Sequence, residues 1–318
     1  MNKQIIDTSS QQLNLNRRDK SKKWKAIALQ KAINSIKGLD FEVKSSADVK
    51  GVKGIGKGML NRIDEILSTG VLEDLASETI NIDLLNKFKA VTGVGDVKAE
   101  QWIKAGFKSI DDVLVAVASG KLEVTHHIQV GLRYYNDFQE RIPRSEIQRI
   151  EKIFSKILTG FNRNLTYHIC GSYRRGCTDS GDVDIIITDP NAEGDIHGNK
   201  YLTGIVEACK SVGFIVDDLT TLGEKKYMGV CKVGSNGKAR RIDIRCFNYG
   251  EYYAALLYFT GSKNFNVLVR QKANALGYSL NEYGLITKST GELHPLKSEE
   301  ELFKILNIPY LPPIERDF

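Results

Sequence analysis

Two acidic residues stand two positions apart at the start of a strongly apolar run in the second half of the sequence. Asp182 and Asp184 are separated by Val183 and followed by three isoleucines. Residues two apart on a β-strand point to the same side, so both carboxylates are expected on one face. Like charges held so close repel each other unless a cation lies between them, and carboxylate oxygens favour Mg²⁺ or Mn²⁺. The pair is therefore a candidate metal site.

A third acid lies in another alternating stretch, residues 240–247. Asp243 stands between Ile242 and Ile244, which predicts a strand with the acid facing away from the isoleucines. If this strand lies beside the first, three carboxylates converge and can bind two metal ions about 4 Å apart, as in-line phosphoryl transfer requires. The plainer alternatives are a solvated strand end for the acid pair and an ion pair between Asp243 and a neighbouring arginine.

Small, hydroxyl-bearing and cationic residues precede the acid pair, and such groups suit phosphate oxygens. They are Gly171, Ser172, Arg175, Ser180 and Gly181. Their presence favours a metal and phosphate site over the plainer alternatives.

The amino-terminal half contains one short repeat. Residues 52–57 read Val-Lys-Gly-Ile-Gly-Lys, and residues 91–96 read Val-Thr-Gly-Val-Gly-Asp. Each copy has the form of a helix-hairpin-helix turn, in which glycines allow close approach and the free N–H groups at the helix start can bind a phosphate. Two copies predict two binding sites for a nucleic-acid backbone, independent of base sequence. One copy alone would favour an ordinary turn between helices.

Charge and cysteine pattern bear on partners and location. The net charge is +6, and residues 1–62 hold 14 Lys or Arg against 5 Asp or Glu. Such a basic segment attracts nucleic acid, with a solvated surface as the alternative. The sequence contains no run apolar enough for a membrane span or signal peptide, and its five cysteines form no CxxC pair. We therefore expect an intracellular protein without zinc or disulfides, which is nuclear or, in a virus, at a cytoplasmic replication site or in the virion.

Hydrophobic periodicity predicts the elements that hold these residues. Helical spacing is found in residues 24–36, 59–67, 82–88, 97–103, 110–117, 145–158, 251–259 and 264–275. Strand-like runs are found in residues 167–170, 183–188, 227–233 and 240–247. The first half is thus expected to be helical, and the second half to mix strands with helices.

The stretch 171–190 resembles the signature of the family X DNA polymerases, of the beta type, within the nucleotidyltransferase superfamily. Residues 258–262, Tyr-Phe-Thr-Gly-Ser, resemble the family's nucleotide-selection segment, and residues 281–283, Asn-Glu-Tyr, resemble a later motif. The resemblance runs from residue 22 onward. It implies an α+β multidomain fold with all-helical amino-terminal domains bearing two helix-hairpin-helix motifs, a mixed-sheet nucleotidyltransferase palm and a C-terminal α/β nucleotide-selection domain.

The domain limits follow from this resemblance and the composition. We expect a flexible tail (1–20), a helical 5′-phosphate-binding, lyase-like domain (21–78) and a helical duplex-binding domain (79–142). A catalytic palm (143–249) and a nucleotide-selection domain (250–318) complete the chain.

The resemblance also implies roles for individual residues. Asp182, Asp184 and Asp243 would bind two Mg²⁺ ions, or Mn²⁺ in their place, and Asp243 would help to activate the primer 3′-hydroxyl. Nucleotide binding is implied for Ser172, Arg175, Ser180, Gly181, Tyr258, Phe259, Gly261 and Asn266. DNA contacts are implied for Lys25, Lys50, Gly54, Gly56, Lys57, Gly93, Gly95, Arg241, Arg270 and Tyr283. The alternative for each is ordinary packing or a surface charge.

The implied activity is template-directed transfer of a dNTP to a primer 3′-hydroxyl in gapped double-stranded DNA during repair, by a monomer with no membrane partner. One position departs from the family: Arg62 stands where a lyase lysine is expected. Arginine is not deprotonated in proteins and cannot form a Schiff base, so lyase activity is doubtful. A template-independent terminal nucleotidyltransferase and a non-catalytic DNA-binding module remain as alternatives.

Overall fold

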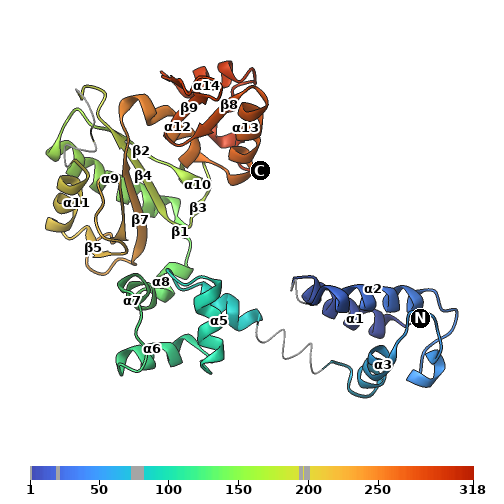
Figure 1. The fold of residues 1–318 in the computed structure, drawn as a ribbon. Helices are drawn as coiled ribbons and strands as arrows, with labels where there is room; N and C mark the ends of the chain where they lie inside the picture. Colours follow the sequence, from blue (N-terminus) through green and yellow to red (C-terminus); the bar gives the residue numbers. More distant parts are fainter. Residues whose placement is uncertain (1, 19–21, 73–81, 193–195, 197–200) are drawn as a thin grey trace. The chain divides into compact units, whose positions relative to one another are not determined.

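The computed structural model describes residues 2–18, 22–72, 82–192, 196 and 201–318 (Figure 1). The chain divides into two units, one formed by residues 1–89 and 95–115 and the other by residues 90–94 and 116–318. In the described part of the chain, no helix is both long enough and apolar enough to span a bilayer.

The first unit begins with a helix where a flexible tail was expected, so that prediction was wrong. Helix α1 (Lys3–Arg18) packs against α2 (Lys23–Lys37) and α3 (Lys57–Thr69). It buries Ile5 and Leu13 together with the polar side chains of Ser9, Gln12 and Asn16. Because so much of its buried face is polar, α1 lacks the apolar period by which a packed helix is recognised in a sequence.

The other helices predicted for the first half are confirmed. They are residues 82–89, α5 (Asp96–Lys104) and α6 (Ile110–Ala118), with a short 3₁₀ helix at Ser46–Val49 before α3. Phe88 and Trp102 are both buried and meet edge to face, with ring centroids 5.3 Å apart. This arrangement is the favoured one for an aromatic pair and joins two of these helices.

The second unit contains a five-stranded mixed sheet in the order β2-β4-β7-β6-β5. Strand β4 (Val183–Thr188) pairs antiparallel with β2 (Thr166–Ile169) and parallel with the central strand β7 (Arg240–Cys246). Strands β6 (Lys226–Cys231) and β5 (Ile215–Asp218) continue the sheet beyond β7. The four strands predicted from the sequence are confirmed, whereas β5 was missed.

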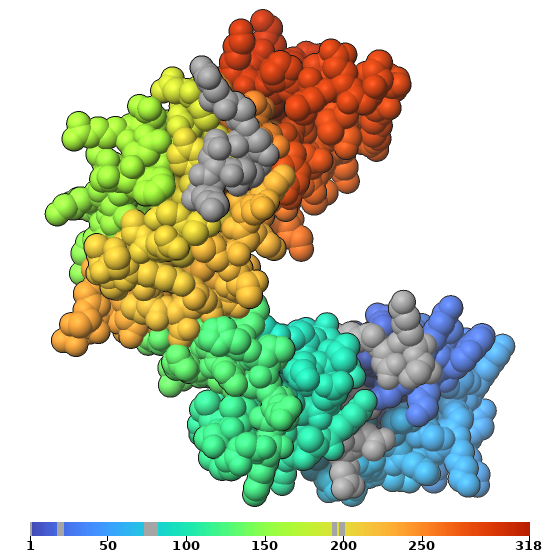
Figure 2. All heavy atoms as spheres, turned by 60° about the vertical axis from the view of Figure 1, so that its left-hand side comes forward, coloured from blue at the N-terminus to red at the C-terminus, as the bar shows by residue number. Residues whose placement is uncertain are grey.

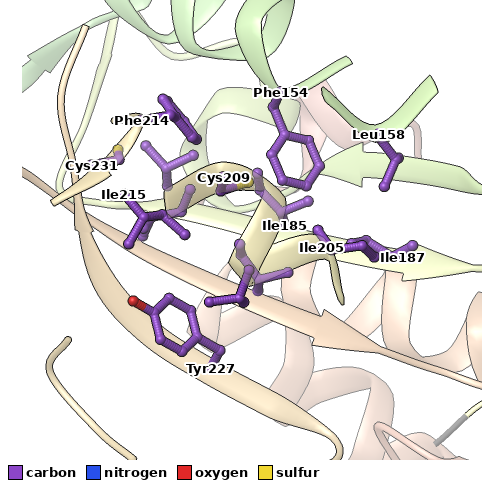
Figure 3. Packing of buried hydrophobic residues seen from close by; sticks show 14 of the residues in the cluster. Phe154, Leu158, Ile185, Ile187, Ile205, Cys209, Phe214, Ile215, Tyr227 and Cys231 are labelled. Carbon is purple, nitrogen blue, oxygen red and sulfur yellow. The ribbon is translucent and has the colours of Figure 1, made fainter. Parts of the chain in front are cut away.

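Two helices cover one face of this sheet. Helix α9 (Arg144–Phe161) buries residues at helical spacing, and α11 (Tyr201–Ser211) packs beside it. Figure 3 shows Phe154 and Ile205, one from each helix, lying against Ile185 and Ile187 of β4. On the outside, the light-green atoms of α9 lie next to the yellow atoms of α11 (Figure 2). The apolar face of the sheet is thus sealed, which leaves the acids of β4 and β7 on the other face.

Shorter elements connect the hairpin region to this sheet. Helices α7 (His126–Arg133) and α8 (Tyr135–Gln139) precede β1 (Ile142–Pro143), which pairs with β3 (Asp179–Ser180). The pairing brings residues 142–143 to the loop that precedes the acid pair.

The last part of the chain is a small α/β layer. Helices α12 (Tyr249–Thr260), α13 (Lys263–Ala275) and α14 (Glu299–Ile305) pack on a three-stranded antiparallel sheet. Its strands are β8 (Tyr278–Asn281), β9 (Gly284–Thr287) and β10 (Leu293–His294), and a 3₁₀ turn follows at Pro313–Glu315. Helix α12 also packs on β4 of the larger sheet, so both layers adjoin the carboxylates.

Buried charges tie the two layers together. Glu299 accepts hydrogen bonds of 2.6 Å from Arg316 and from Arg174 of the short helix α10 (Gly171–Arg174). Arg174 also donates to the hydroxyl of Thr260 at the end of α12, 2.7 Å away. Each buried guanidinium thus has a partner, as buried charges require.

Candidate active site

The register of the central strands places two of the three acids opposite each other. Asp184 on β4 and Asp243 on β7 are Cα partners in the parallel pair. Neighbouring strands lie about 4.8 Å apart, so the two carboxylates share one small region. Val183, Ile242 and Ile244 point to the buried face. The strand pairing on which convergence of the acids depended is therefore confirmed.

Burial and mutual repulsion raise the pKa values of two of the carboxylates and so disfavour their ionised forms. Desolvation, followed by the charges of Asp182 and Asp243, raises the pKa of Asp184 from 3.8 to about 7. Desolvation and the charge of Asp182 raise the pKa of Asp243 to about 6. Such repulsion is relieved by a cation held between the groups.

The third acid is engaged by an arginine. The Arg241 guanidinium donates to Asp182 at 2.9 Å, and both side chains are partly exposed. The arginine pairing considered for Asp243 is thus made by Asp182. Among the residues that the structure describes, no group of three or more His, Cys, Asp or Glu is gathered closely enough to hold a metal ion. In this contact Arg241 engages only the Oδ2 atom of Asp182.

The donor set nevertheless fits hard divalent cations. All three acids supply carboxylate oxygens, the ligands that Mg²⁺ and Mn²⁺ prefer. A Cβ at Gly171 would lie 3.1 Å from an Asp184 oxygen, and Gly171 has φ +58°. A side chain at that position would crowd the carboxylate, so the glycine keeps its approach open.

Hydrogen bonds fix two of the polar residues in the loop before the acids. The Ser172 hydroxyl donates to the Ser180 hydroxyl at 2.7 Å. Arg175 donates through Nη1 to the carbonyl of Thr260 at 2.8 Å. The Ser172 hydroxyl and the Arg175 guanidinium are thus each held by a hydrogen bond, and their binding of phosphate stays a prediction.

A cavity of about 640 Å³ joins this loop to helices α12 and α13. Its lining includes two of the acids and seven of the eight residues predicted to bind nucleotide. They are Asp182 and Asp184 with Ser172, Arg175, Gly181, Tyr258, Phe259, Gly261 and Asn266. Ser180 is the exception, because it is buried behind Ser172. Arg270, predicted to contact DNA, also lines the cavity, whereas Asp243 and Tyr283 are not among the lining residues.

The aromatic wall of the cavity is braced by polar contacts. Tyr258 and Phe259 meet edge to face at 5.0 Å, and the Arg270 guanidinium lies 4.8 Å from the Tyr258 ring. The Asn266 amide donates to the carbonyl of Tyr258 at 2.7 Å. Arg245 lies over Phe259, 4.7 Å from its ring. A planar ligand would thus meet a wall fixed in position.

The cationic residue Arg141 was missed. Arg141 lines the cavity, and its Nη1 would lie 3.2 Å from a Cβ on Gly181. It forms an ion pair with Asp179. In the sequence Arg141 stands beside Ile142 and Pro143 at an expected domain boundary, so only the β1–β3 pairing brings it here.

Both hairpins have the predicted turn. Gly54 has φ +94° and Gly93 has φ +91°, while Gly56 and Gly95 are the residues before α3 and α5. A Cβ at Gly54 would lie 2.8 Å from the Ser35 hydroxyl, so the first turn packs closely on α2. Lys25, Lys50 and Lys57 are exposed in the same unit. The N–H groups at the start of each helix can bind an anion.

The lyase position is occupied by a side chain turned onto its own helix. Arg62 donates to the carbonyl of Gly58 at 3.2 Å. A guanidinium supplies no neutral amine for a Schiff base. That the chain lacks lyase activity at this position stays a prediction.

Four family models match separate parts of the chain. Residues 141–249 match the sequence model of the DNA polymerase beta palm, and residues 255–317 that of the DNA polymerase beta thumb. Residues 86–139 match the fingers domain of DNA polymerase lambda, and residues 1–72 match a helix-hairpin-helix domain.

Three relatives are similar over most of this chain. It is 34% identical over 311 residues to DNA polymerase lambda of Rattus norvegicus, covering 93% of this chain and 53% of that protein. It is 31% identical over 320 residues to DNA polymerase lambda of Arabidopsis thaliana, covering 92% and 58%. It is 26% identical over 334 residues to DNA nucleotidylexotransferase of Xenopus laevis, covering 93% and 64%. The chain thus spans between about half and two thirds of the length of these relatives.

The mixed sheet carrying paired acids and the α/β layer beside it thus have the palm and thumb architecture of the polymerase class. Within that class, the chain belongs to family X of the DNA polymerases, with a palm and thumb of the beta type. Family X polymerases are metal-dependent.

Proposed function

We propose that this chain is a template-directed DNA polymerase that fills short gaps, transferring a dNTP to a primer 3′-hydroxyl and releasing pyrophosphate. The observation that carries the proposal is the register of Asp184 and Asp243 on adjacent strands, with Asp182 and Asp184 lining a cavity suited to one nucleotide. The polymerase relatives support the same reaction.

The cavity offers a place for each part of the nucleotide. The Ser172 hydroxyl, the Arg175 guanidinium and the backbone at Gly181 would bind the triphosphate, with Arg141 as a further cation. Tyr258 and Phe259 would lie against the sugar. Binding in this position aligns the α-phosphate with the primer end and converts a bimolecular step into an oriented one.

The three acids have separate tasks in this proposal. Asp182 and Asp184 would hold the metal ions at the triphosphate, and Asp243 would face the primer terminus. Two divalent ions, when bound, stabilise the charge of the attacking and leaving oxygens. Asp243, with a pKa raised to about 6, can accept a hydrogen bond from the 3′-hydroxyl as its proton is lost.

The remaining basic features would bind DNA. The hairpin glycines Gly54, Gly56, Gly93 and Gly95 open two helix starts, where backbone N–H groups can bind phosphates of gapped DNA. Arg270 would contact the template-side edge of the new base pair, since it lines the cavity beyond Tyr258. Contacts to phosphates carry no sequence information, which suits a repair enzyme that acts at any gap.

The test is primer extension with Mg²⁺ and dNTPs on duplexes with gaps of one, two and five nucleotides, each with and without a 5′-phosphate. We expect templated incorporation that is most efficient on the one-nucleotide gap bearing the phosphate. Untemplated addition to single strands would instead favour a terminal nucleotidyltransferase. DNA binding without any extension would indicate a non-catalytic DNA-binding module.

A further inference from the structure

The predicted triphosphate ligand Arg175 is already paired with a carboxylate from the far end of the sequence. Its Nε donates to Oδ1 of Asp317 at 2.9 Å, and its Nη2 lies 2.9 Å from the same oxygen. The Cys177 thiol donates to the other oxygen, Oδ2, at 3.3 Å. These hydrogen bonds hold the pKa of Asp317 below its ordinary value, so the carboxylate is charged at neutral pH.

The segment that carries Asp317 is firmly seated on the thumb. Arg316 is fully buried, pairs with Glu299 and lies beneath the rings of Phe265 and Phe303. Ser262, a cavity residue, donates through its backbone N–H to the Arg316 carbonyl at 3.1 Å and through its hydroxyl to the Phe318 carbonyl at 3.0 Å. Asp317 therefore reaches the palm loop from a fixed base.

Arg175 and Asp317 differ in how firmly their side chains are held. The Arg175 side chain is 15% exposed and is also held by the Thr260 carbonyl, whereas the Asp317 side chain is 49% exposed. Loss of the carboxylate should thus leave the guanidinium in place, while the carboxylate itself can turn toward solvent. The N–H groups that Asp317 occupies are the ones through which an arginine binds a phosphate in a forked manner.

From this geometry we propose that Asp317 is an internal counter-ion that competes with the incoming triphosphate for Arg175 and thereby sets the affinity for nucleotide. The inference rests on the proposed function, since it takes Arg175 as a triphosphate ligand. A nucleotide would displace the carboxylate from the guanidinium, and the carboxylate would return after pyrophosphate leaves.

The test measures anion affinity before catalysis. Inorganic tripolyphosphate is titrated into the free protein by calorimetry in low salt, for wild type, Asp317→Asn and Asp317→Ser. We expect both neutral variants to bind it roughly threefold to tenfold more tightly, because a partly screened charge is removed beside the site. The difference should shrink at high salt. In primer extension, the same variants should show a lower KM for dNTP with kcat little changed.

Two controls separate competition from a general structural effect. Asp218, on the edge strand β5, has a carboxylate of similar exposure that is paired with Lys210. Asp218→Asn should therefore leave the affinity for tripolyphosphate unchanged. In an Arg175→Gln background, Asp317→Asn should no longer alter affinity, because the competition acts through that guanidinium.

The possible outcomes are distinct. Weaker or equal tripolyphosphate binding by both folded variants would overturn the proposal and make Asp317 a residue that merely positions Arg175. Absence of tripolyphosphate binding by every protein would also overturn it. Tighter binding by the variants, together with no primer extension by wild type, would retain the counter-ion and reject the polymerase.

Discussion

Replacing Asp184 with asparagine should stabilise the metal-free protein at neutral pH. In the folded chain, burial and the neighbouring Asp182 and Asp243 raise the pKa of Asp184 from 3.8 to about 7. The unfolded chain keeps the ordinary value, so between these two pKa values the folded state binds a proton that the unfolded state has released. The stability contributed by this carboxyl is therefore full at low pH and lost as pH rises toward 7.

The magnitude follows from the same shift. A rise from 3.8 to about 7 corresponds to roughly 4 kcal/mol at pH 8 if fully expressed. Asp184 is partly accessible to solvent, which screens the repulsion, so we expect a gain on the order of 2 kcal/mol for Asp184→Asn. For a domain of this size, that gain corresponds to a rise in Tm of roughly 4–8 °C.

The assay is urea or thermal unfolding of wild type and Asp184→Asn in EDTA, from pH 5 to pH 8. The variant should gain stability relative to wild type as pH rises, and Mg²⁺ should reduce the difference by binding only the wild-type site. Asp218→Asn is the control of opposite sign: despite partial burial, hydrogen bonds from Lys210 and Tyr227 lower the pKa of Asp218. That variant should lose stability above the unfolded pKa. A difference for Asp184→Asn that does not change with pH would refute the assumed repulsion.

Two further outcomes test other parts of the structure. Glu299→Ala leaves the buried guanidinium groups of Arg174 and Arg316 without their shared carboxylate, and urea unfolding should show a loss of roughly 3–5 kcal/mol; a loss below 1 kcal/mol would contradict the buried network. Borohydride should trap little or no protein on an abasic 5′-end, because Arg62 cannot form a Schiff base; efficient trapping at a lysine would show that another amine performs the lyase reaction.

The paired strands of the palm could be predicted because β7 alternates between buried and partly buried residues and β4 carries a continuous apolar run after its acid. Ile242 and Ile244 are buried while Asp243 between them is only partly buried, and the isoleucines after Asp184 form the apolar core of β4. The chemistry at these positions was therefore readable from local spacing. Helix α1 was not, because its contacts with α2 and α3 bury polar side chains such as Ser9 and Gln12.

Contacts between distant segments could not be predicted from local sequence patterns. The pair Arg175–Asp317 joins residues 142 positions apart, and the pair Arg141–Asp179 depends on the short β1–β3 pairing. The choice of Asp182, and not Asp243, as partner of Arg241 likewise depends on side-chain reach across two strands. Such pairings depend on tertiary geometry, which no spacing along the chain encodes.

The most direct test of the three-acid site is extension of a one-nucleotide gap by wild type and Asp243→Ala, with DNA affinity measured in parallel. Asp243 lies opposite Asp184 and makes no part of either hairpin. We expect the variant to bind the gapped duplex as wild type does and to incorporate no nucleotide with Mg²⁺ or Mn²⁺. Incorporation at a rate near that of wild type would contradict the assignment of Asp243 to the catalytic centre.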